Sequence, residues 1–459
     1  MPNISVREFL PQYNPALSLR AKFSYTVFQY ISDILKVFGI TAPSTGSGKT
    51  TVTMAFLSLL KNSVPCKIGP DYIDPGLESA VTGSRTYNID RWIEGRAYER
   101  TLSTLASRYD YAVVEGVMGL YDSGSPIDLS TNFYFRKFRI PYILVIDCSK
   151  TAESTYYIAK GFLGKRCIGV VLNNYRSEKH LNMVRNEFVR HGIRIIGAVP
   201  RDQEVVIESR HLGLHTGLET PDVRDKALRV SKYLDISFVD ELPEIHSNAV
   251  PQNKPDSAKK INIWIAYDKA FNFYYASSLD YLERNGKINY FSPVSGEYPE
   301  DPDLVYFGGG YPEIFAEELS KNRKCMESVK NISESGTPVI AECGGLMYLE
   351  HSISTDNGEY RMAGIFPGRV AMGKRLTLSY TKMVAEQNSV MFRKGETVYG
   401  HEYHYSTTVD PSPKLLRNIS GRGIDGKFDG LAIENTQATY SHFSLGRYGK
   451  RLIKKAMGQ

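Results

Sequence analysis

The sequence predicts an α/β protein of two domains. Two blocks alternate short apolar runs with longer helix-like stretches, which is the pattern of parallel α/β folds. Between them lies a polar segment, 246–260, which has two prolines and no hydrophobic period, as linkers do. In each block a glycine-rich turn follows an apolar run, and ligands of open α/β sheets bind where strands end. The chain has 459 residues, enough for about two or three domains of ordinary size.

Composition places the chain among ordinary globular proteins. Hydrophobic residues make up 42% and charged residues 23%, and no run of about 18 apolar residues occurs, so we expect no membrane-spanning helix. The net charge of +6 is small and scattered, which suits anionic small molecules as substrates and does not indicate nucleic acid. No secretory signal is recognised at the start, and five sparse cysteines without metal-ligand spacing favour a reducing, cytoplasmic setting without zinc.

The first block is expected to form a domain over 36–245, preceded by an N-terminal extension, 1–35, to which no role is assigned. Short apolar runs predict its buried strands. They lie at 36–40, 111–115, 142–147, 168–173 and 195–199. After the linker the second domain is expected over 261–459. Its predicted strands lie at 261–266, 304–307, 338–341, 397–399 and 430–433.

A phosphate-binding loop is predicted where the first strand ends. The run VFGITAPSTGSGKTT leads from that strand through a glycine-rich turn into a helix predicted at 52–60. The glycines allow backbone amides to point at phosphate oxygens, Lys49 supplies a positive charge, and the Thr50 hydroxyl suits Mg²⁺. The strict pattern has glycine where Pro43 stands, yet a strand, GSGKTT and a helix in this order strongly indicate a nucleotide site. The residues expected to line it are Thr45, Gly46, Ser47, Gly48, Lys49, Thr50 and Thr51.

Carboxylates elsewhere in the first block are candidate Mg²⁺ or substrate residues. Glu115 closes a predicted strand, where ligands gather in parallel sheets, although an edge carboxylate without a metal is the alternative. Asp71 and Asp74 lie in GPDYIDP, a loop bounded by Gly and Pro that is otherwise a simple turn. Asn173, at the end of another predicted strand, either hydrogen-bonds a purine or caps the strand.

The second block contains a cysteine at a sharp turn between a strand and a helix. PVIAECGGLMY has the pattern of a nucleophile elbow with cysteine in place of serine. The two glycines after Cys343 allow the tight turn, and the helix N-terminus is expected to favour the thiolate. Upstream, YFGGGYPE ends another predicted strand in three glycines, whose amides are candidates for stabilising an oxyanion. The alternative role of a lone cysteine is that of a small buried hydrophobe.

A thiol nucleophile needs a base, and three histidines of the second block are candidates. His442, in ATYSHF, follows a late predicted strand and is the first choice. His401 and His404, in GHEYHYS, are its rivals. Any one of them, taken alone, is more often a structural residue than a catalyst, so the motif spacing leaves the choice open.

These motifs together resemble one family, the cobyrinic acid a,c-diamide synthases, which are glutamine-dependent amidases of corrinoid synthesis. The matching stretches are APSTGSGKTTVT, KIGPDYIDPG, VVEGVMGLYD, YFGGGYPE, AECGGLMYL, GHEYHYS and TYSHF. With others between them they run in order from about residue 40 to residue 443, nearly the whole chain. The resemblance implies an N-terminal P-loop domain similar to dethiobiotin synthetase and a C-terminal class I glutamine amidotransferase domain.

The resemblance also implies a reaction and a set of roles. A carbon–nitrogen ligase is expected, in which ATP and Mg²⁺ activate a substrate carboxylate as an acyl phosphate and ammonia from glutamine converts it to the amide. Cys343 would attack glutamine and His442 would carry the proton. The other implied sites are Gly309 and Gly310 in the oxyanion hole, Lys49 and Thr50 on ATP and Mg²⁺, Asp71 and Glu115 beside the metal, Asp74 and Asp122 in the synthetase site, and Asn173 near the purine.

Several alternatives stay open at this point. Many class I amidotransferases have Glu two residues after the catalytic His, whereas Ser444 stands there in this chain, so a third triad member is not assigned. The same diamidation of nickel-sirohydrochlorin is the nearest alternative function, and cobyric acid synthase fits GPDYIDP and GHEYHYS less well. A P-loop ATPase switch with an inactive amidotransferase domain is an alternative of another class, against which Cys343 and His442 argue. The oligomeric state is not predicted.

Overall fold

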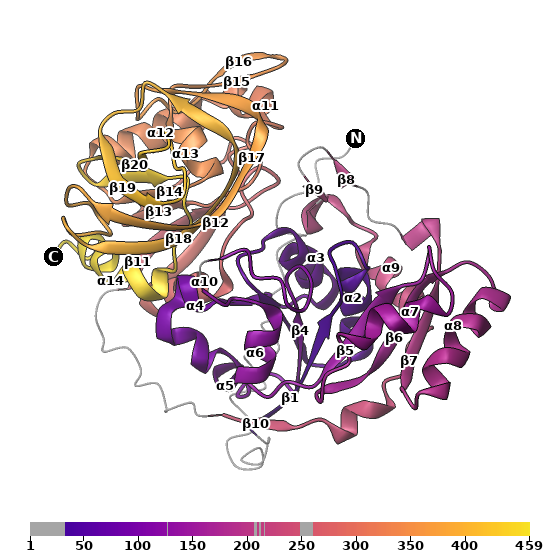
Figure 1. The fold of residues 1–459 in the computed structure, drawn as a ribbon. Coiled ribbons are helices and arrows are strands. Elements are labelled where there is room, and N and C mark those ends of the chain that lie inside the picture. The colour runs from indigo at the N-terminus through magenta and orange to yellow at the C-terminus, as the bar shows by residue number, and fades with distance from the viewer. Residues whose placement is uncertain (1–32, 126, 206–208, 211–212, 215, 248–259) are drawn as a thin grey trace. The chain divides into compact units, whose positions relative to one another are not determined.

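The computed structural model describes residues 33–125, 127–205, 209–210, 213–214, 216–247 and 260–459 (Figure 1). The chain divides into two compact units. The first runs to Arg91 and from Arg96 to Gln252, and the second holds Trp92–Gly95 and the chain from Asn253 onward. Residues 1–32 of the expected extension, 1–35, lie outside the description, as do residues 248–259 of the expected linker, 246–260.

The first unit is built on a parallel sheet. Its strands are β1 (Ile34–Thr41), β2 (Ser63–Ile68), β3 (Tyr87–Ile89), β4 (Tyr111–Glu115), β5 (Tyr142–Asp147), β6 (Cys167–Tyr175), β7 (Ile195–Pro200) and β10 (Glu244–His246). In the described residues their order is β3-β2-β4-β1-β5-β6-β7, with β10 antiparallel on β1, and β8 (Ser209–Arg210) and β9 (Gly213–Leu214) form a separate pair. Because β2, β4 and β1 run parallel, their carboxyl ends meet at one edge of the sheet.

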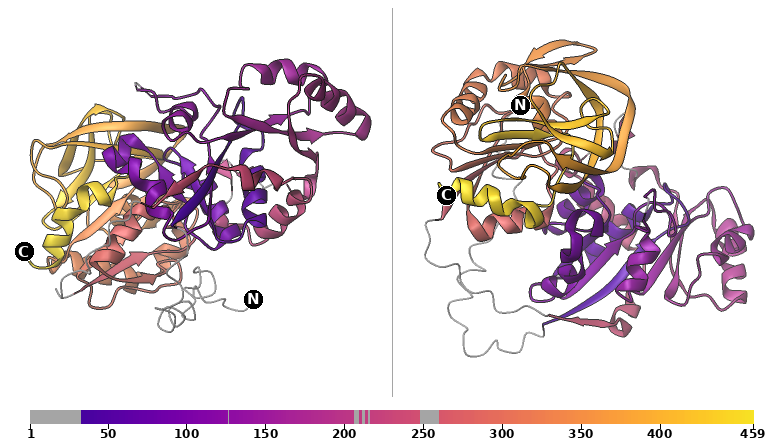
Figure 2. Two further views of the ribbon diagram at one scale, coloured as in Figure 1. Left: turned by 90° about the horizontal axis from the view of Figure 1, so that it is seen from below. Right: turned by 60° about the vertical axis from the view of Figure 1, so that its left-hand side comes forward.

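Helices cover both faces of this sheet (Figures 1 and 2). They are α2 (Lys49–Leu59), α3 (Ile73–Thr82), α5 (Thr101–Leu105), α6 (Thr131–Lys137), α7 (Ser154–Lys160), α8 (Glu178–Arg190) and α9 (Val223–Ser231), and α4 (Arg91–Glu94) spans the division between the units. The apolar sides of α2, α3 and α9 pack with strand residues such as Phe38 and Val113. Helices α7 and α8 pack with Leu144 and Val170, whose side chains point to the opposite face.

The strands that carry the motifs of the first block lie where the sequence predicts them. The predicted strands 111–115 and 142–147 match β4 and β5, and the other three fall within β1, β6 and β7. Strands β2 and β3 are not predicted, because SVPCKI mixes polar residues and a proline with its apolar ones and YNI is very short. The helix predicted at 52–60 begins earlier, at Lys49, because Gly48 turns the chain directly into the helix with a φ of 92°.

The second unit has a mixed sheet with a parallel core. Its strands are β11 (Ile261–Ala266), β12 (Gly286–Phe291), β13 (Leu304–Phe307), β14 (Val339–Glu342), β15 (Ser352–Thr355), β16 (Gly358–Arg361), β17 (Arg369–Ala385), β18 (Thr397–Val409), β19 (Lys414–Ser420), β20 (Phe428–Ile433) and β21 (Thr436–Thr439). In the described residues the order is β12-β11-β13-β14-β21-β20-β19-β17-β15-β16, with β18 on β17. The strands from β12 to β21 in this order are parallel, so β13, β14 and β21 end at one edge.

Helices cover the parallel part of this second sheet on both faces. They are α10 (Ala276–Asn285), α11 (Ala316–Lys321), α12 (Arg323–Glu334), α13 (Gly344–Leu349) and α14 (Leu445–Ala456). Helices α11, α12 and α13 pack with Phe307 and Ala341, whereas α10 and α14 pack with Tyr306 and Ile340. In the described part of the chain, no helix combines the length and the apolar character needed to cross a bilayer.

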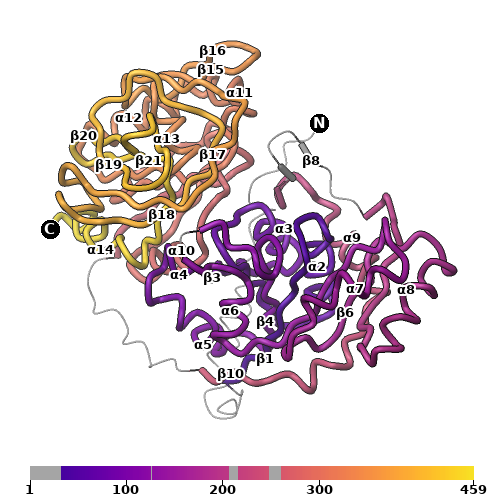
Figure 3. The backbone as a smooth tube through the Cα atoms, in the orientation of Figure 1, coloured from indigo at the N-terminus to yellow at the C-terminus, as the bar shows by residue number. Residues whose placement is uncertain are grey.

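The predicted strands of the second block are present, but a long hairpin extends beyond them. The predicted strands 261–266 and 304–307 match β11 and β13, and the one predicted at 338–341 lies one residue later. Strand β17 is not predicted, and β18 has 13 residues where three are predicted (Figure 3). The register of β17 on β18 shifts between Met372 and Thr377, and such an irregularity breaks the alternation that would reveal a strand.

Gly39, in the middle of β1, has no room for a side chain. A Cβ at this position would lie 2.2 Å from Cζ of Phe135, whose ring is buried under the sheet. Gly161, by contrast, has a φ of −68° and nothing within 4 Å of the position of a Cβ. The two glycines therefore differ in packing, although both tolerate the backbone conformation of alanine.

We expect Gly39→Ala to lower the free energy of unfolding by about 1–3 kcal/mol, because overpacking forces buried rings to shift. Gly161→Ala is the matched control and is expected to be neutral or slightly stabilising. Urea denaturation of both variants and of the wild type checks the difference. Equal stability of the two variants would contradict the packing of Phe135 on β1.

Candidate active sites

The loop between β1 and α2 is a preformed cradle for phosphate. Gly46 and Gly48 have φ values of 81° and 92°, which glycine adopts without strain. A Cβ on Gly48 would lie 2.2 Å from Nδ2 of Asn173, and this amide donates a hydrogen bond to the Ser47 carbonyl at 3.0 Å. Asn173, near the end of β6, therefore supports the loop through this hydrogen bond and this close contact. Its expected contact with a purine stays a prediction.

The side chains of this loop differ in exposure. Thr45 and Gly46 are exposed at the tip, Thr50 and Thr51 are half-buried, and Ser47 is buried. Lys49 is also buried, and its Nζ lies 3.5 Å from the carbonyl of Ser44. Burial lowers the pKa of Lys49, and the charges of nearby carboxylates, Glu115 foremost, oppose this effect. The ammonium group is thus held over the loop, where a phosphate would lie.

A buried lysine, Lys67, gathers the carboxylates that the sequence singles out. Its Nζ lies 2.6 Å from Asp74 Oδ2, 2.6 Å from Glu115 Oε1 and 3.4 Å from Asp71 Oδ2. Burial alone would lower the pKa of Lys67, but the three carboxylates outweigh burial and raise it. Lys67 in turn holds the pKa of Asp74 below its usual range, against the opposing effect of burial. One ammonium faces three carboxyl groups, and burial together with the charge of Asp74 raises the pKa of Asp71 to about 7, so this carboxyl is partly protonated at neutral pH.

The same cluster suits Mg²⁺ by the chemistry of its donors. The Thr50 hydroxyl donates to Glu115 Oε1 at 2.9 Å, so the hydroxyl and the carboxylate lie together at the start of α2. Among the described residues, no group of three or more His, Cys, Asp or Glu side chains is arranged to hold a metal by itself. Mg²⁺ commonly takes only one or two carboxylates and completes its shell with phosphates and water, so Thr50, Glu115 and Asp71 fit it.

Asp122 is close enough to Lys49 for its charge to act on that lysine. Its Oδ2 accepts a hydrogen bond from the Gly119 amide at 3.0 Å, which fixes the turn after β4.

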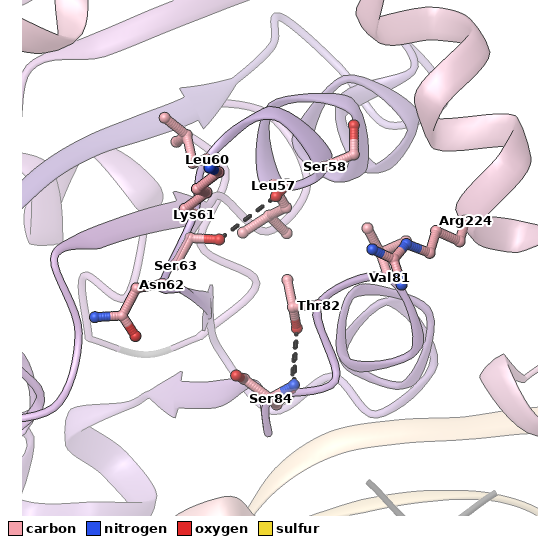
Figure 4. A pocket seen from close by; sticks show the side chains of 10 residues that line it. All are labelled: Leu57, Ser58, Leu60, Lys61, Asn62, Ser63, Val81, Thr82, Ser84 and Arg224. Atoms are coloured by element: carbon pink, nitrogen blue, oxygen red, sulfur yellow. Dashed lines mark hydrogen bonds between the residues drawn. The ribbon is translucent and has the colours of Figure 1, made fainter. Parts of the chain in front are cut away.

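A separate cavity of about 240 Å³ lies at the far end of α2, where Lys61 and Arg224 are among its lining residues (Figure 4). None of the residues expected to bind the nucleotide lines that cavity.

In the second unit, Cys343 stands at the turn between β14 and α13. Its backbone has a φ of 49° and a ψ of −103°, a strained conformation for a residue other than glycine. The Cys343 amide donates to the Thr439 carbonyl at 2.7 Å, which ties the turn to the end of β21. A Cβ on Gly345 would lie 2.6 Å from the Phe307 carbonyl, so the turn requires glycine at the second position after the cysteine. This geometry is that of a nucleophile elbow.

The glycines after β13 lie against this elbow, and they are not equivalent. The Gly309 amide donates to the Phe273 carbonyl at 3.3 Å in an antiparallel bridge. The Gly310 amide lies 3.1 Å from the position of a Cβ on Gly344, so it is next to the cysteine turn. The geometry favours Gly310 over Gly309 as an oxyanion donor, and it adds the Gly344 amide, which hydrogen-bonds to the Cys343 sulfur.

The Cys343 thiol is buried in the second unit. It is 4% exposed, and its Sγ donates to the Tyr403 carbonyl at 3.2 Å. Burial, and after it the charge of Glu313, raise the pKa of this thiol, which outweighs the opposing hydrogen bond from Gly344. The expected effect of the helix N-terminus is present in the hydrogen bond from the Gly344 amide, which lowers the pKa of Cys343, but burial of the sulfur outweighs it. A base must remove the proton.

His442 lies beside the elbow with an acidic partner. Its Nδ1 is 3.3 Å from Oε2 of Glu342, the residue that directly precedes the cysteine. On its other side, a Cβ on Gly309 would come 2.9 Å from His442 Nε2, so the imidazole fills space that the glycine leaves. His442 follows β21, whose last residue, Thr439, pairs with Glu342 on β14. The imidazole is thus held between the end of β14 and the glycine turn after β13.

The two rival histidines have other environments. His404 stacks on the Tyr440 ring at 3.9 Å, its Nδ1 lies 2.8 Å from the Ser406 carbonyl, and its Nε2 lies 3.5 Å from Glu402 Oε2. Both ring nitrogens therefore face acceptors on its own strand. His401 is buried, and burial, followed by the effect of His442, lowers its pKa to about 3. The His401 and His442 backbones exchange hydrogen bonds, so the three histidines are neighbours.

Two residues of these sites, Lys67 and Glu342, are missing from the sequence-based prediction. Lys67 begins the motif KIGPDYIDP, and a lysine inside a predicted loop motif could have signalled a charge partner for its two aspartates. Glu342 directly precedes Cys343 in AECGG, where alternation along a strand would only say that it faces away from Ala341. Nothing in the local pattern relates it to His442, which is 100 residues later in the chain.

Two domain-family models match the chain. A CobQ/CobB/MinD/ParA nucleotide binding domain matches residues 38–214, and a CobB/CobQ-like glutamine amidotransferase domain matches residues 262–449. Solved structures resemble parts of the chain more distantly. A crystal structure of a glutamine amidotransferase covers 43% of this chain and 99% of its own, at 14% identity and a TM-score of 0.32.

Curated relatives align with this chain over nearly their whole length. A protein of Saccharolobus solfataricus named cobyrinate a,c-diamide synthase is 34% identical over 431 residues, which cover 90% of this chain and 99% of the relative. A protein of Methanosphaera stadtmanae with the same name is 35% identical over 431 residues, covering 88% of this chain and 94% of the relative. Identity at this level across both domains shows common descent, and the chain belongs to the cobyrinate a,c-diamide synthase family.

Proposed function

We propose that this protein amidates the a and c acetate groups of cobyrinic acid, with glutamine as the nitrogen source and ATP as the activating nucleotide. The observation that carries the proposal is the alignment, over nearly full length, with proteins named cobyrinate a,c-diamide synthase. The same chain holds a P-loop in one unit and a cysteine elbow in the other, as a reaction with two half-reactions requires.

The second unit would release ammonia from glutamine. His442 accepts the proton of the Cys343 thiol, and the sulfur attacks the carboxamide carbon to give a tetrahedral oxyanion. The amides of Gly310 and Gly344 are proposed to stabilise that oxyanion, and their position beside the cysteine turn supports this role. Collapse of the intermediate expels ammonia, which takes the proton back from the imidazolium, and leaves a glutamyl thioester. Water activated by the same imidazole then hydrolyses the thioester to glutamate.

The first unit would activate the acceptor carboxylate. A carboxylate resists attack by ammonia because it is negatively charged and has no good leaving group. Its oxygen displaces ADP from the γ-phosphorus of ATP, and ammonia then displaces phosphate from the acyl phosphate. The loop amides and Lys49 offset the charge of the phosphates during the transfer.

Three further residues complete the proposed nucleotide and metal site. Thr50, Glu115 and Asp71 would hold Mg²⁺, which when bound supplies positive charge to the β- and γ-phosphates. Asp74 and Asp122 border the same space and are proposed to belong to the synthetase site, and Asn173 is proposed to lie near the purine. Lys67 is proposed to hold the three carboxylates together when no metal is bound.

The reaction itself tests the proposal. The protein, incubated with ATP, Mg²⁺, glutamine and cobyrinic acid, is expected to give products one and two amide groups heavier than the substrate, as detected by mass spectrometry. Nickel-sirohydrochlorin is the parallel substrate. Products from the nickel macrocycle alone would reassign the substrate, and ATP binding without any glutamine hydrolysis would favour a P-loop switch.

Replacement of Cys343 by alanine separates the two half-reactions. We expect Cys343→Ala to lose glutamine-dependent amidation and to keep amidation with ammonium chloride, because the acyl phosphate is made in the other unit. Product formation from each nitrogen source, measured side by side, checks this result. His442→Ala is expected to behave in the same way. Loss of ammonium-dependent synthesis in a folded Cys343→Ala protein would contradict the division of labour.

Replacement of Lys49 tests the phosphate site. Lys49→Ala is expected to lower amidation at least about 10²-fold with either nitrogen source, because a charge that stabilises phosphoryl transfer is lost. The matched control is Lys61→Ala, which removes an exposed lysine at the other end of α2 and should leave amidation unchanged. Wild-type rates in the Lys49 variant would refute the assigned role.

A further inference from the structure

We propose that Glu342 is the positioning residue of the glutaminase site: it orients the His442 imidazole and places a negative charge beside it. The inference rests on the proposed function and deepens it, because it fills the triad position that Ser444 leaves without a carboxylate. The residue comes from the turn of the nucleophile itself, one position before Cys343.

The Glu342 carboxylate is held rigidly in the core. Its side chain is 5% exposed. The Tyr306 hydroxyl donates to Oε2 at 2.7 Å, and the Phe443 amide donates to Oε1 at 2.9 Å. Tyr306 lies on the neighbouring strand β13, and Phe443 directly follows His442. One oxygen is thus bound to the backbone of the residue next to the base, and the other points at the base.

This arrangement selects the working form of the imidazole. A carboxylate oxygen 3.3 Å from Nδ1 favours the neutral tautomer with its proton on Nδ1, which leaves the Nε2 lone pair to accept a thiol proton. A Cβ on Gly309 would lie 2.9 Å from Nε2, and the amide of the next residue, Gly310, lies 3.1 Å from the position of a Cβ on Gly344 in the elbow. When the imidazole becomes positively charged, the carboxylate offsets that charge, which is the part played by the acid in hydrolytic triads.

A second acid–histidine pair of the same unit, Glu402 and His404, has different hydrogen-bond partners. Glu402 and His404 are also buried and lie 3.5 Å apart. Glu402, however, accepts hydrogen bonds from the amides of Arg422 and Gly423 and from the Ser379 hydroxyl, so it closes a loop and a hairpin. His404 turns its other nitrogen to a carbonyl. Its Nε2 faces Glu402 at 3.5 Å, so the two ring nitrogens of His404 have other neighbours than those of His442.

The test compares Glu342→Gln with Glu402→Gln, which makes the same change beside the other imidazole. In Glu342→Gln we expect glutaminase kcat to fall about 10²-fold or more, with KM little changed, because the imidazolium loses its counter-charge. The acid limb of the pH profile of kcat/KM should move to lower pH by about one unit or more. In Glu402→Gln the acid limb should stay in place, and Glu342→Asp, which keeps the charge, should keep the wild-type acid limb. Ammonium-dependent amidation serves as the control for folding.

The outcomes separate the inference from the proposed function. A wild-type protein that hydrolyses no glutamine contradicts the proposed function. A wild type that hydrolyses glutamine, with a folded Glu342→Gln variant of unchanged kcat and unchanged acid limb, overturns the inference alone. A shifted acid limb in Glu402→Gln instead would assign the base to His404. If Glu342→Gln does not fold, Tyr306→Phe replaces it: this variant keeps the carboxylate but frees it, and an unchanged kcat there would overturn the inference.

Discussion

Both sites depend on one constraint, a sharp turn of the backbone where a central parallel strand passes into a helix. In the first unit Gly48 provides the turn with a φ of 92° and opens the loop amides to phosphate. In the second unit the reactive residue itself is at the turn, because Cys343 has a φ of 49°. A strained residue persists only where its surroundings fix it, and the bond from its amide to Thr439 and the contact of Gly345 with Phe307 do so.

What could be predicted from the sequence lies within short segments. The P-loop, the elbow and the strands that precede them each occupy one run of residues, and the structure has them where they are predicted. The contact of Glu342 with His442 depends instead on the parallel pairing of β14 with β21, which brings residues 100 positions apart together. The role of Lys67 depends in the same way on the neighbouring ends of β2 and β4. The burial that raises the pKa of Cys343 is a property of the packed fold, so the local sequence does not reveal it.

The two sites differ in the partners that stabilise their buried charged groups. Around Lys67 three carboxyl groups face one ammonium, and a bound metal cation would add positive charge beside them. Around Glu342 a single carboxylate is held by neutral donors, Tyr306 and the Phe443 amide, and faces an imidazole. The first arrangement attracts a permanent positive charge. The second stabilises a positive charge that exists only during the reaction.

This difference explains why a buried, neutral thiol can still serve as a nucleophile. An isolated thiolate at Cys343 is unfavourable, because burial and Glu313 both oppose it. In the proposed mechanism, transfer of the proton to His442 would create the thiolate together with an imidazolium, and Glu342 would place a negative charge beside that cation. The charges then alternate in sign across the site, so each is offset by its neighbour. The nucleophile therefore forms only together with its base, and the carboxylate beside that base determines how readily it forms.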